Sequence, residues 1–237
     1  RSRGLGDVYK RQVLGHPDDA GVDISAMLTS NQVRQVFNGK IVKECKRIPA
    51  KVQKDELENR KDLRNLLTVT IDGDDAKDFD DAISIVKNEK GYLLYVHIAD
   101  VSHYVKENCA LDQEAYLRGN SIYVCDRVVP MLPFDLSNGI CSLNPNVDRL
   151  TITCAMQVDE RGNLLTYNVF PSVIHSDKRC TYKKVNACLA GDETILEEYA
   201  EVKDLLFTLE PLAKLLKKQS HLSLIHISEP TRPEPIS

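Results

Sequence analysis

Six aspartates occupy positions within residues 72–81, directly after the apolar run 66–71. Carboxylates placed this close together raise one another's pKa unless positive charge lies among them. The loop that carries them must therefore either be fully solvated or hold a cation. Mg²⁺ prefers oxygen ligands and keeps coordination positions open for water and phosphate. We predict a divalent-cation site at a strand end, where the strand fixes Asp72 and the loop folds the later carboxylates back towards it.

Three other interpretations of this stretch lead to different chemistry. An EF-hand loop beginning at Asp72 would need a ligand and then Gly at positions where the sequence has Ala76 and Lys77, so this interpretation is excluded. The spacing DGD is also found in DxD-type phosphotransferases, but the second group of aspartates at 78–81 does not suit that chemistry. A solvated acidic loop is the usual explanation of a charge run. It leaves Phe79 unexplained, because burial of that ring would turn its neighbours inward.

The rest of the chain shows mostly β-type alternation up to residue 176 and helical spacing after it. Two hairpins are expected, one turning near residues 88–91 and one across residues 160–163. Leu205, Leu209, Leu212 and Leu216 recur at helical spacing and predict an amphipathic helix, which Pro211 should kink. These elements predict an α+β fold with a mixed or antiparallel sheet. The predicted strands are residues 66–71, 81–88, 91–105, 120–124, 150–159 and 164–176, and the predicted helices are residues 30–48, 110–118, 180–191 and a segment from 192 onwards.

The two ends of the chain encode one DNA element read in opposite directions. The stretch LSLIHISEPTR, residues 222–232, back-translates to DNA whose reverse complement encodes SRGLGDVYKRQ, residues 2–12. This element resembles a transposase sequencing adapter. We therefore expect residues 1–12 and 222–237 to be translated adapter rather than native protein.

Charge and cysteine usage argue against several classes of protein. The chain has 31 Lys and Arg against 35 Asp and Glu, a net charge of −4, which argues against a protein whose whole surface coats nucleic acid. Its seven cysteines are irregularly spaced and form no CxxC pair. This pattern argues against a zinc site and favours reduced, buried thiols in a cytosolic protein. The sequence contains no apolar run long enough to span a bilayer.

The stretch TVTIDGDDAKDFDDAISI, residues 68–85, closely resembles the opening of the RNB catalytic domain in the ribonuclease II / ribonuclease R family. The resemblance continues through HIADVSHYV, LDQEAYLRGNSIYV, VVPMLPFDLSNGICSLNPNVDRL and CTYKKV, so it covers essentially all of residues 13–221. The stretch RGNSIYV points to the ribonuclease R branch of this family.

This resemblance implies a Mg²⁺-dependent hydrolase that degrades single-stranded RNA processively from its 3′ end to nucleoside 5′-monophosphates. The family's four functional aspartates fall on Asp72, Asp78, Asp80 and Asp81. All four would help to hold the metal, and Asp80 would be the residue most needed for the chemistry. The other two aspartates of the run are expected to be solvated. Tyr123 matches an aromatic residue that stacks near the RNA 3′ end in the family, a mode of binding that tolerates any base.

The resemblance also assigns parts of the chain to domains. Residues 13–25 would be the end of a cold-shock domain with an OB fold, residues 26–53 a helical linker, and residues 54–221 the N-terminal half of the RNB domain. Asp62 and Arg64 are expected to form an ion pair at the domain entry. The family's later SPIRRY segment, which supplies an arginine to the scissile phosphate, does not occur in the sequence, and neither does its S1 RNA-binding domain. We therefore expect the 237-residue chain by itself to be poorly soluble and poorly active.

The expected partners follow from the same resemblance. They are the 3′ end of single-stranded RNA and, in the cytoplasm, the ribosome or the RNA-decay machinery; no membrane is expected, and the full-length protein should be a monomer. The alternative is a non-catalytic RNA-binding protein that retains an RNB-like fold. The intact set of four aspartates argues against it, because a degenerate site would be free to lose any of them.

Four further residues are weaker candidates for the site. His97 and His103 could be metal ligands or general bases, but a histidine in a strand is more often structural, and the family's mechanism requires no histidine base. Asn144 and Arg149 could contact phosphate or brace a loop, and we favour the bracing role.

Overall fold

The computed structural model describes residue 16 and residues 19–227, with only the backbone for residues 220–227. The chain divides into two compact units. The first comprises the residues up to Cys45 together with Glu107–Pro133, and the second comprises Lys46–Lys106 and the residues from Phe134 onwards. The aspartate run belongs to the second unit.

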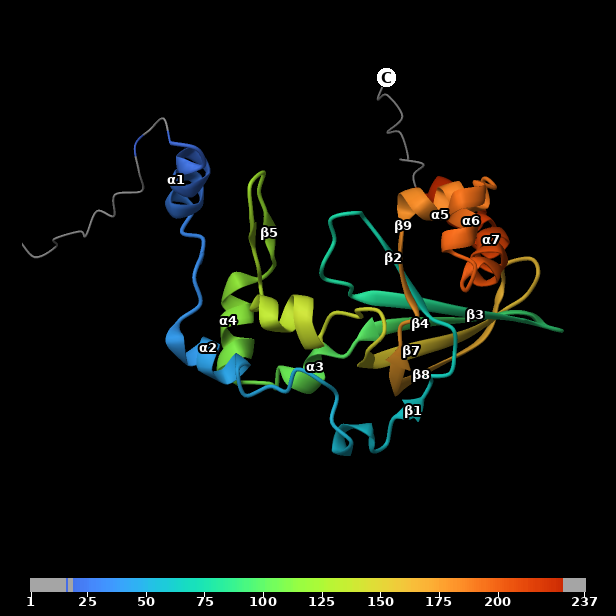
Figure 1. Ribbon diagram of the computed structural model, residues 1–237, viewed down its shortest axis with the longest axis horizontal. Coiled ribbons are helices and arrows are strands. Elements are labelled where there is room, and N and C mark those ends of the chain that lie inside the picture. Colours follow the sequence, from blue (N-terminus) through green and yellow to red (C-terminus); the bar gives the residue numbers. More distant parts are fainter. Residues whose placement is uncertain (1–15, 17–18, 228–237) are drawn as a thin grey trace, which may run out of the picture. The chain divides into compact units, whose positions relative to one another are not determined.

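A seven-stranded mixed sheet forms the centre of the second unit, with strand order β1-β8-β7-β4-β3-β2-β9 (Figure 1). Neighbours from β8 to β2 pair antiparallel, whereas β1 pairs parallel with β8 and β9 pairs parallel with β2. The predicted mixed sheet is therefore confirmed. The strands are β1 (Lys61–Asp62), β2 (Val69–Asp72), β3 (Asp81–Asn88), β4 (Gly91–Ala99), β7 (Asp148–Val158), β8 (Leu164–His175) and β9 (Lys178–Thr181).

Both predicted hairpins are present. Strands β3 and β4 meet at a two-residue turn between Asn88 and Gly91, and β7 and β8 are joined across residues 159–163. Gly91 has φ +115°, and a Cβ at this position would lie 2.4 Å from the carbonyl oxygen of Val158. This turn therefore requires glycine.

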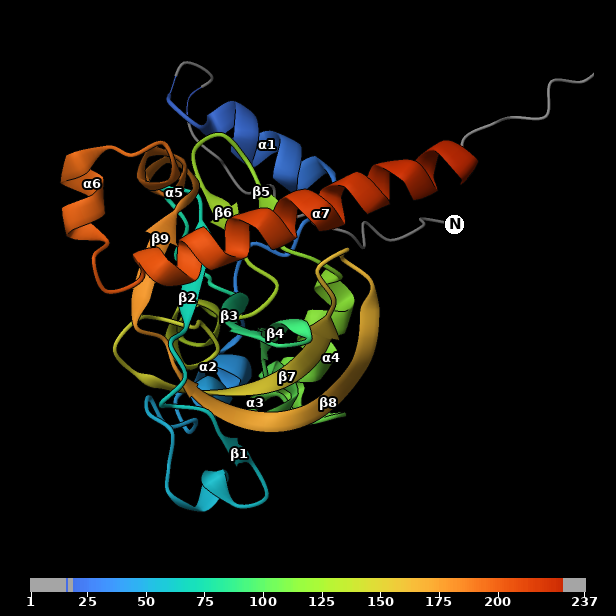
Figure 2. The same cartoon turned by 90° about the vertical axis from the view of Figure 1, so that its right-hand side faces the viewer.

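Helices α5 (Tyr182–Leu189), α6 (Glu193–Glu198) and α7 (Lys203–Ile227) lie together against one face of the sheet (Figures 1 and 2). Leu205 and Leu212 of the predicted stripe are buried there, whereas Leu216 is 37% exposed. The predicted long segment from residue 192 is divided, because the chain leaves α6 at the buried Tyr199 before α7 begins. Helix α7 runs on through Pro211. The short helical turns η1 (Asp55–Leu57), α3 (Val101–Tyr104) and η2 (Asp135–Ile140) complete the second unit.

The first unit contains α1 (Val22–Ser30), α2 (Gly39–Cys45), α4 (Ala110–Arg118) and the hairpin of β5 (Ile122–Tyr123) with β6 (Val128–Val129). Helix α4 ends, as predicted, before Gly119, which has φ +77°.

The prediction of a helix over residues 30–48 is wrong for much of its length, since only Gly39–Cys45 is helical. The side chain of Asn38 accepts hydrogen bonds from the backbone N–H groups of Lys40 and Ile41, so the helix starts here. Val36, which contributed to the helical pattern, is 82% exposed and lies on no packed face.

Two assignments of the chain's ends fall partly on residues outside the described part. The expected end of a cold-shock domain at 13–25 is described only at residue 16 and from 19 onwards, where a turn leads into α1. The expected adapter residues 1–12 and 228–237 lie outside the described residues, and residues 222–227 continue α7. None of the helices in the described part combines the length and apolarity needed to cross a membrane.

A chain of buried polar side chains crosses the sheet, with His97 at its centre. His97 Nε2 lies 3.0 Å from the hydroxyl of Ser84, and Nδ1 lies 2.7 Å from the hydroxyl of Thr153. Thr68 and Ser172 extend this chain to either side. Because His97 is fully buried with both ring nitrogens paired, its role is structural.

We predict that His97 makes the fold sensitive to acid. Burial lowers the pKa of His97 from 6.5 to about 4. Between these values the unfolded chain binds a proton at this position that the folded chain does not, so stability falls as the pH drops from 6.5 to 4. The expected loss is about 3 kcal/mol. Urea unfolding at pH 6.5 and pH 4 should show this loss in the free energy of unfolding of the wild type. The His97→Gln variant should lack this contribution to the pH dependence. Equal pH dependence in both proteins would contradict the assignment.

Candidate active site

The four predicted site aspartates lie at and between two neighbouring strand ends. Asp72 is the last residue of β2 and Asp81 is the first residue of β3. These strands pair antiparallel, so the intervening loop, residues 73–80, folds back on itself and carries Asp78 and Asp80. We call residues 72–81 the aspartate loop.

Phe79 anchors the aspartate loop from within. Its side chain is only 3% exposed. Its backbone N–H donates to the buried hydroxyl of Ser142 at 2.9 Å, and its carbonyl accepts from the N–H of Leu143 at 2.8 Å. The carbonyl of Asp80 accepts from the N–H of Ala99 at 2.9 Å. Segments distant in sequence thus hold the backbone of Phe79 and of Asp80. Phe79 is buried, and its burial turns this part of the loop inward.

The electrostatics of the loop show that its carboxylates affect one another. Burial is the largest cause that raises the pKa of Asp72, followed by the negative charges of Asp81 and Asp78. Burial of the Asp80 carboxyl, again followed by the charges of Asp78 and Asp81, raises the pKa of Asp80. The guanidinium of Arg179 acts on Asp72 in the opposite direction. The aspartates therefore lie close enough to destabilise one another's ionised forms, and a bound cation would relieve this repulsion.

Exposure does not separate the remaining two aspartates from the predicted four. Asp74 and Asp75 are exposed, and so are Asp80 and Asp81, whereas Asp72 and Asp78 are partly buried. The exposure of Asp74 and Asp75 agrees with the expectation that they are solvated.

The donor set fits a hard divalent cation in type, but it is not closed into a coordination sphere. Four carboxylates on one short loop offer the oxygen ligands that Mg²⁺ prefers. In the described part of the chain, however, no three His, Cys, Asp or Glu side chains are already arranged to hold a metal ion.

Tyr123, the predicted RNA-stacking residue, belongs to the first unit. It lies on β5 opposite Val128, and its side chain is 67% exposed. An exposed aromatic ring suits contact with a ligand better than a place in the core.

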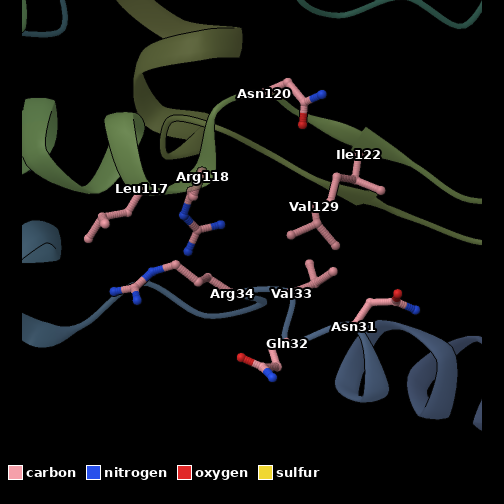
Figure 3. Close-up of a pocket in the computed structure, with 9 residues that line it drawn as sticks. All are labelled: Asn31, Gln32, Val33, Arg34, Leu117, Arg118, Asn120, Ile122 and Val129. Carbon is pink, nitrogen blue, oxygen red and sulfur yellow. The ribbon is translucent and has the colours of Figure 1, made fainter.

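A pocket of about 250 Å³ lies in the first unit beside the same hairpin (Figure 3). Val33, Ile122 and Val129 gather on one side of it, and Arg34 and Arg118 lie on the other. Both arginines bond to one carboxylate, that of Glu114, at 2.8–3.0 Å, so the pocket wall carries one uncompensated positive charge. The pocket is lined by Asn31, Gln32, Val33, Arg34, Leu117, Arg118, Asn120, Ile122 and Val129.

His103 has a structural environment like that of His97. Its Nδ1 lies 3.2 Å from Arg60 Nη2, which can only donate, and its Nε2 lies 2.8 Å from Glu56 Oε1. Arg60 also pairs with Asp100 at 2.5 Å. His103 therefore links the entry segment to the end of β4.

The other candidates brace loops, as favoured from the sequence. Arg149 donates to the carbonyls of Ser142 and Gly139 at 2.7 and 3.1 Å, and Asn144 donates to the carbonyl of Asn138 at 3.0 Å. These contacts hold the segment whose Ser142 anchors Phe79.

The predicted ion pair of Asp62 with Arg64 is present at 2.6 Å, and Arg64 also reaches Asp148 at 3.1 Å. The expected burial of the cysteines holds for four of the seven, whereas Cys109 and Cys154 are partly buried and Cys125 is exposed.

Two residues that contact the aspartate loop could not be identified from the sequence. Ser142 lies 63 residues from Phe79, and Arg179 lies 105 residues from Asp74, whose carbonyl it contacts. Neither residue has a local pattern that marks it, and only the sheet pairing of β9 with β2 brings Arg179 to the loop.

Comparison with known proteins agrees with this arrangement. Residues 60–232 match the RNB domain family. The match therefore includes residues expected to be translated adapter, and that expectation stays a prediction. Ribonuclease R of Thermotoga maritima is 50% identical over 210 residues, which are 87% of this chain and 29% of the relative.

Solved structures show the same fold. Mycoplasma genitalium RNase R in complex with ribose-methylated single-stranded RNA matches with a TM-score of 0.80 and 34% identity, over 88% of this chain and 32% of that one. The same protein with double-stranded RNA also gives a TM-score of 0.80 and 34% identity, with 88% and 37% of the chains covered. Yeast Ssd1, described as a pseudonuclease, shares the fold alone, with a TM-score of 0.66, 17% identity and coverage of 85% and 25%.

The chain spans about 30% of the length of the ribonuclease R proteins that it matches. Its aspartate loop lies within the matched segment. On the matched RNB domain and the 50% identity to a ribonuclease R, this chain belongs to the RNB family.

Proposed function

We propose that this chain is part of a Mg²⁺-dependent exoribonuclease that hydrolyses single-stranded RNA processively from the 3′ end and releases nucleoside 5′-monophosphates. The observation that carries the proposal is the aspartate loop. It carries the four aspartates that the resemblance matches to the family's functional ones. They lie close enough to influence one another's pKa, on a backbone held by a buried ring. A solvated acidic loop without a ligand would not need a buried phenylalanine between its aspartates.

Each aspartate has a proposed role. Asp72, Asp78 and Asp81 would hold the metal, joined by Asp80, which we assign to the chemistry. When bound, Mg²⁺ would stabilise negative charge on the phosphate and lower the pKa of a bound water. The chain's own contribution is to fix the spacing of these carboxylates, through the strand ends that carry Asp72 and Asp81 and the backbone hydrogen bonds on either side of Phe79.

Tyr123 is proposed to stack on a base near the RNA 3′ end. Its 67% exposed side chain offers an aromatic face for this purpose. Stacking accepts any base, which suits an enzyme that degrades RNA without regard to sequence.

A second candidate function is RNA binding without catalysis. It is the alternative that the sequence left open. Retention of all four aspartates favours the enzyme. We further propose that the longer protein acts as a monomer in the cytoplasm, near ribosomes or the RNA-decay machinery, where cysteines remain reduced.

The decisive variant is Asp80→Asn in the complete protein, supplied with Mg²⁺ and with 3′-labelled or 5′-labelled single-stranded RNA. We expect mononucleotide release from the 3′ end to fall by at least about 100-fold, because a group acting on the reacting atoms typically contributes that much. RNA affinity, measured by fluorescence anisotropy, should change little.

Asp75→Asn is the matched control, because it removes the same charge from the same loop at an exposed position. It should retain activity within about twofold, since isolated surface substitutions have small effects. Persistent cleavage by Asp80→Asn would overturn the role of Asp80. A wild type that binds RNA but never cleaves it would favour the non-catalytic alternative.

A further inference from the structure

Arg179 reaches the aspartate loop from the edge of the sheet. It lies on β9, the last strand in the sheet order, where it pairs in parallel register with Thr70 of β2. Register neighbours in adjacent strands project to the same side of a sheet, and so do residues two apart along one strand. The side chains of Arg179, Thr70 and Asp72 therefore share one face of the sheet.

The guanidinium of Arg179 contacts both limbs of the aspartate loop. Its Nη2 donates to the carbonyl of Gly73 at 3.2 Å and to the carbonyl of Asp74 at 2.5 Å. Its central carbon lies 5.3 Å from the centroid of the Phe79 ring. The side chain of Arg179 thus links the start of the loop to Phe79, which lies between Asp78 and Asp80.

Arg179 orders the loop without using a carboxylate. Its acceptors are neutral backbone carbonyls, and among the described residues it takes part in no ion pair. An arginine paired with Asp72 or Asp78 would neutralise oxygens that a metal needs. The contacts of Arg179 to carbonyls and to a ring occupy no carboxylate oxygen.

The position of Arg179 carries a free-energy cost, because polar atoms at and beside this residue are buried without a hydrogen-bond partner in the described structure. In the described part of the chain, Arg179 Nε and the hydroxyl of Thr70 are both buried without a hydrogen-bond partner. Leaving buried polar atoms unpaired is unfavourable. Among the described residues, the Arg179 side chain makes its hydrogen bonds to the two loop carbonyls through Nη2.

We propose that Arg179 is a positioning residue that holds the aspartate loop in the conformation able to bind a divalent cation. The part of this inference that concerns metal rests on the proposed function. The part that concerns loop order does not.

The expected size of the effect follows from the lost contacts. Lysine at position 179 keeps the charge but replaces a planar fork with a single ammonium group, so it cannot reproduce both the carbonyl contacts and the ring contact. Loss of about one net hydrogen bond lowers the equilibrium constant between the ordered and the open loop roughly tenfold. Protection of the loop amides falls by the same factor. The apparent affinity for a ligand of the ordered loop falls by up to this factor.

The test compares wild type, Arg179→Lys and Arg179→Met in the whole chain, first without metal. Amide hydrogen exchange is measured by NMR at Phe79 and Leu143, which report the loop, and at Leu94, which reports the core of the sheet. Both variants should lose roughly tenfold protection at Phe79 and Leu143 with no change at Leu94. Unchanged protection at Phe79, or an equal loss at all three amides, would overturn the proposal.

Mn²⁺ binding, followed by electron paramagnetic resonance, provides the second measurement. Arg179→Lys should weaken binding, by up to roughly tenfold, at constant charge. Lys178→Arg is the matched control on the preceding residue, whose side chain contacts the carbonyl of Glu198 and the ring of Tyr199 instead; it should leave both measurements unchanged. Equal Mn²⁺ affinity in wild type and Arg179→Lys would contradict the proposal. A wild type that binds no Mn²⁺ would contradict the proposed function, while the exchange data would still decide the role of Arg179.

Discussion

The burial of Phe79 within a run of aspartates is the interaction on which the site depends. Carboxylates at neighbouring positions repel one another, and the raised pKa values of Asp72 and Asp80 reflect burial together with that repulsion. A loop held only by solvent-exposed contacts would relieve the repulsion by spreading out. Placing one aromatic ring in the core, with hydrogen bonds to its backbone N–H and carbonyl, keeps the adjacent carboxylates together without neutralising them.

The sheet supplies the supports for this arrangement. Antiparallel pairing of β2 with β3 brings Asp72 and Asp81 to neighbouring strand ends, and parallel pairing of β9 with β2 brings Arg179 to the same loop. The segment carrying Ser142 is held in turn by Arg149. These supports contact backbone atoms of the loop and the ring of Phe79, so none of them occupies a carboxylate oxygen.

Strands β2, β3, β4, β7 and β8 could be predicted from the sequence, but β1, β9 and the supports of the loop could not. Alternating apolar residues identified β3, β4, β7 and β8, because one face of each strand must be buried. The helix expected over residues 30–48 failed because apolar spacing alone does not show whether a face is packed; Val36 is exposed and Asn38 starts the helix late. Ser142 and Arg179 are recognisable only once strand order is known, since their contacts to the loop span 63 and 105 residues.

The central claim is that one divalent cation binds at the aspartate loop rather than diffusely over an acidic surface. Paramagnetic broadening of backbone amide signals by substoichiometric Mn²⁺ tests this claim most directly. The account predicts that the amides of residues 72–81 and of Ala99 and Leu143, which bond to this loop, broaden first. Asp159 and Asp192, exposed carboxylates that accept hydrogen bonds in their own turns, should stay sharp. Broadening that is equally strong near Asp159 or Asp192 would contradict the account.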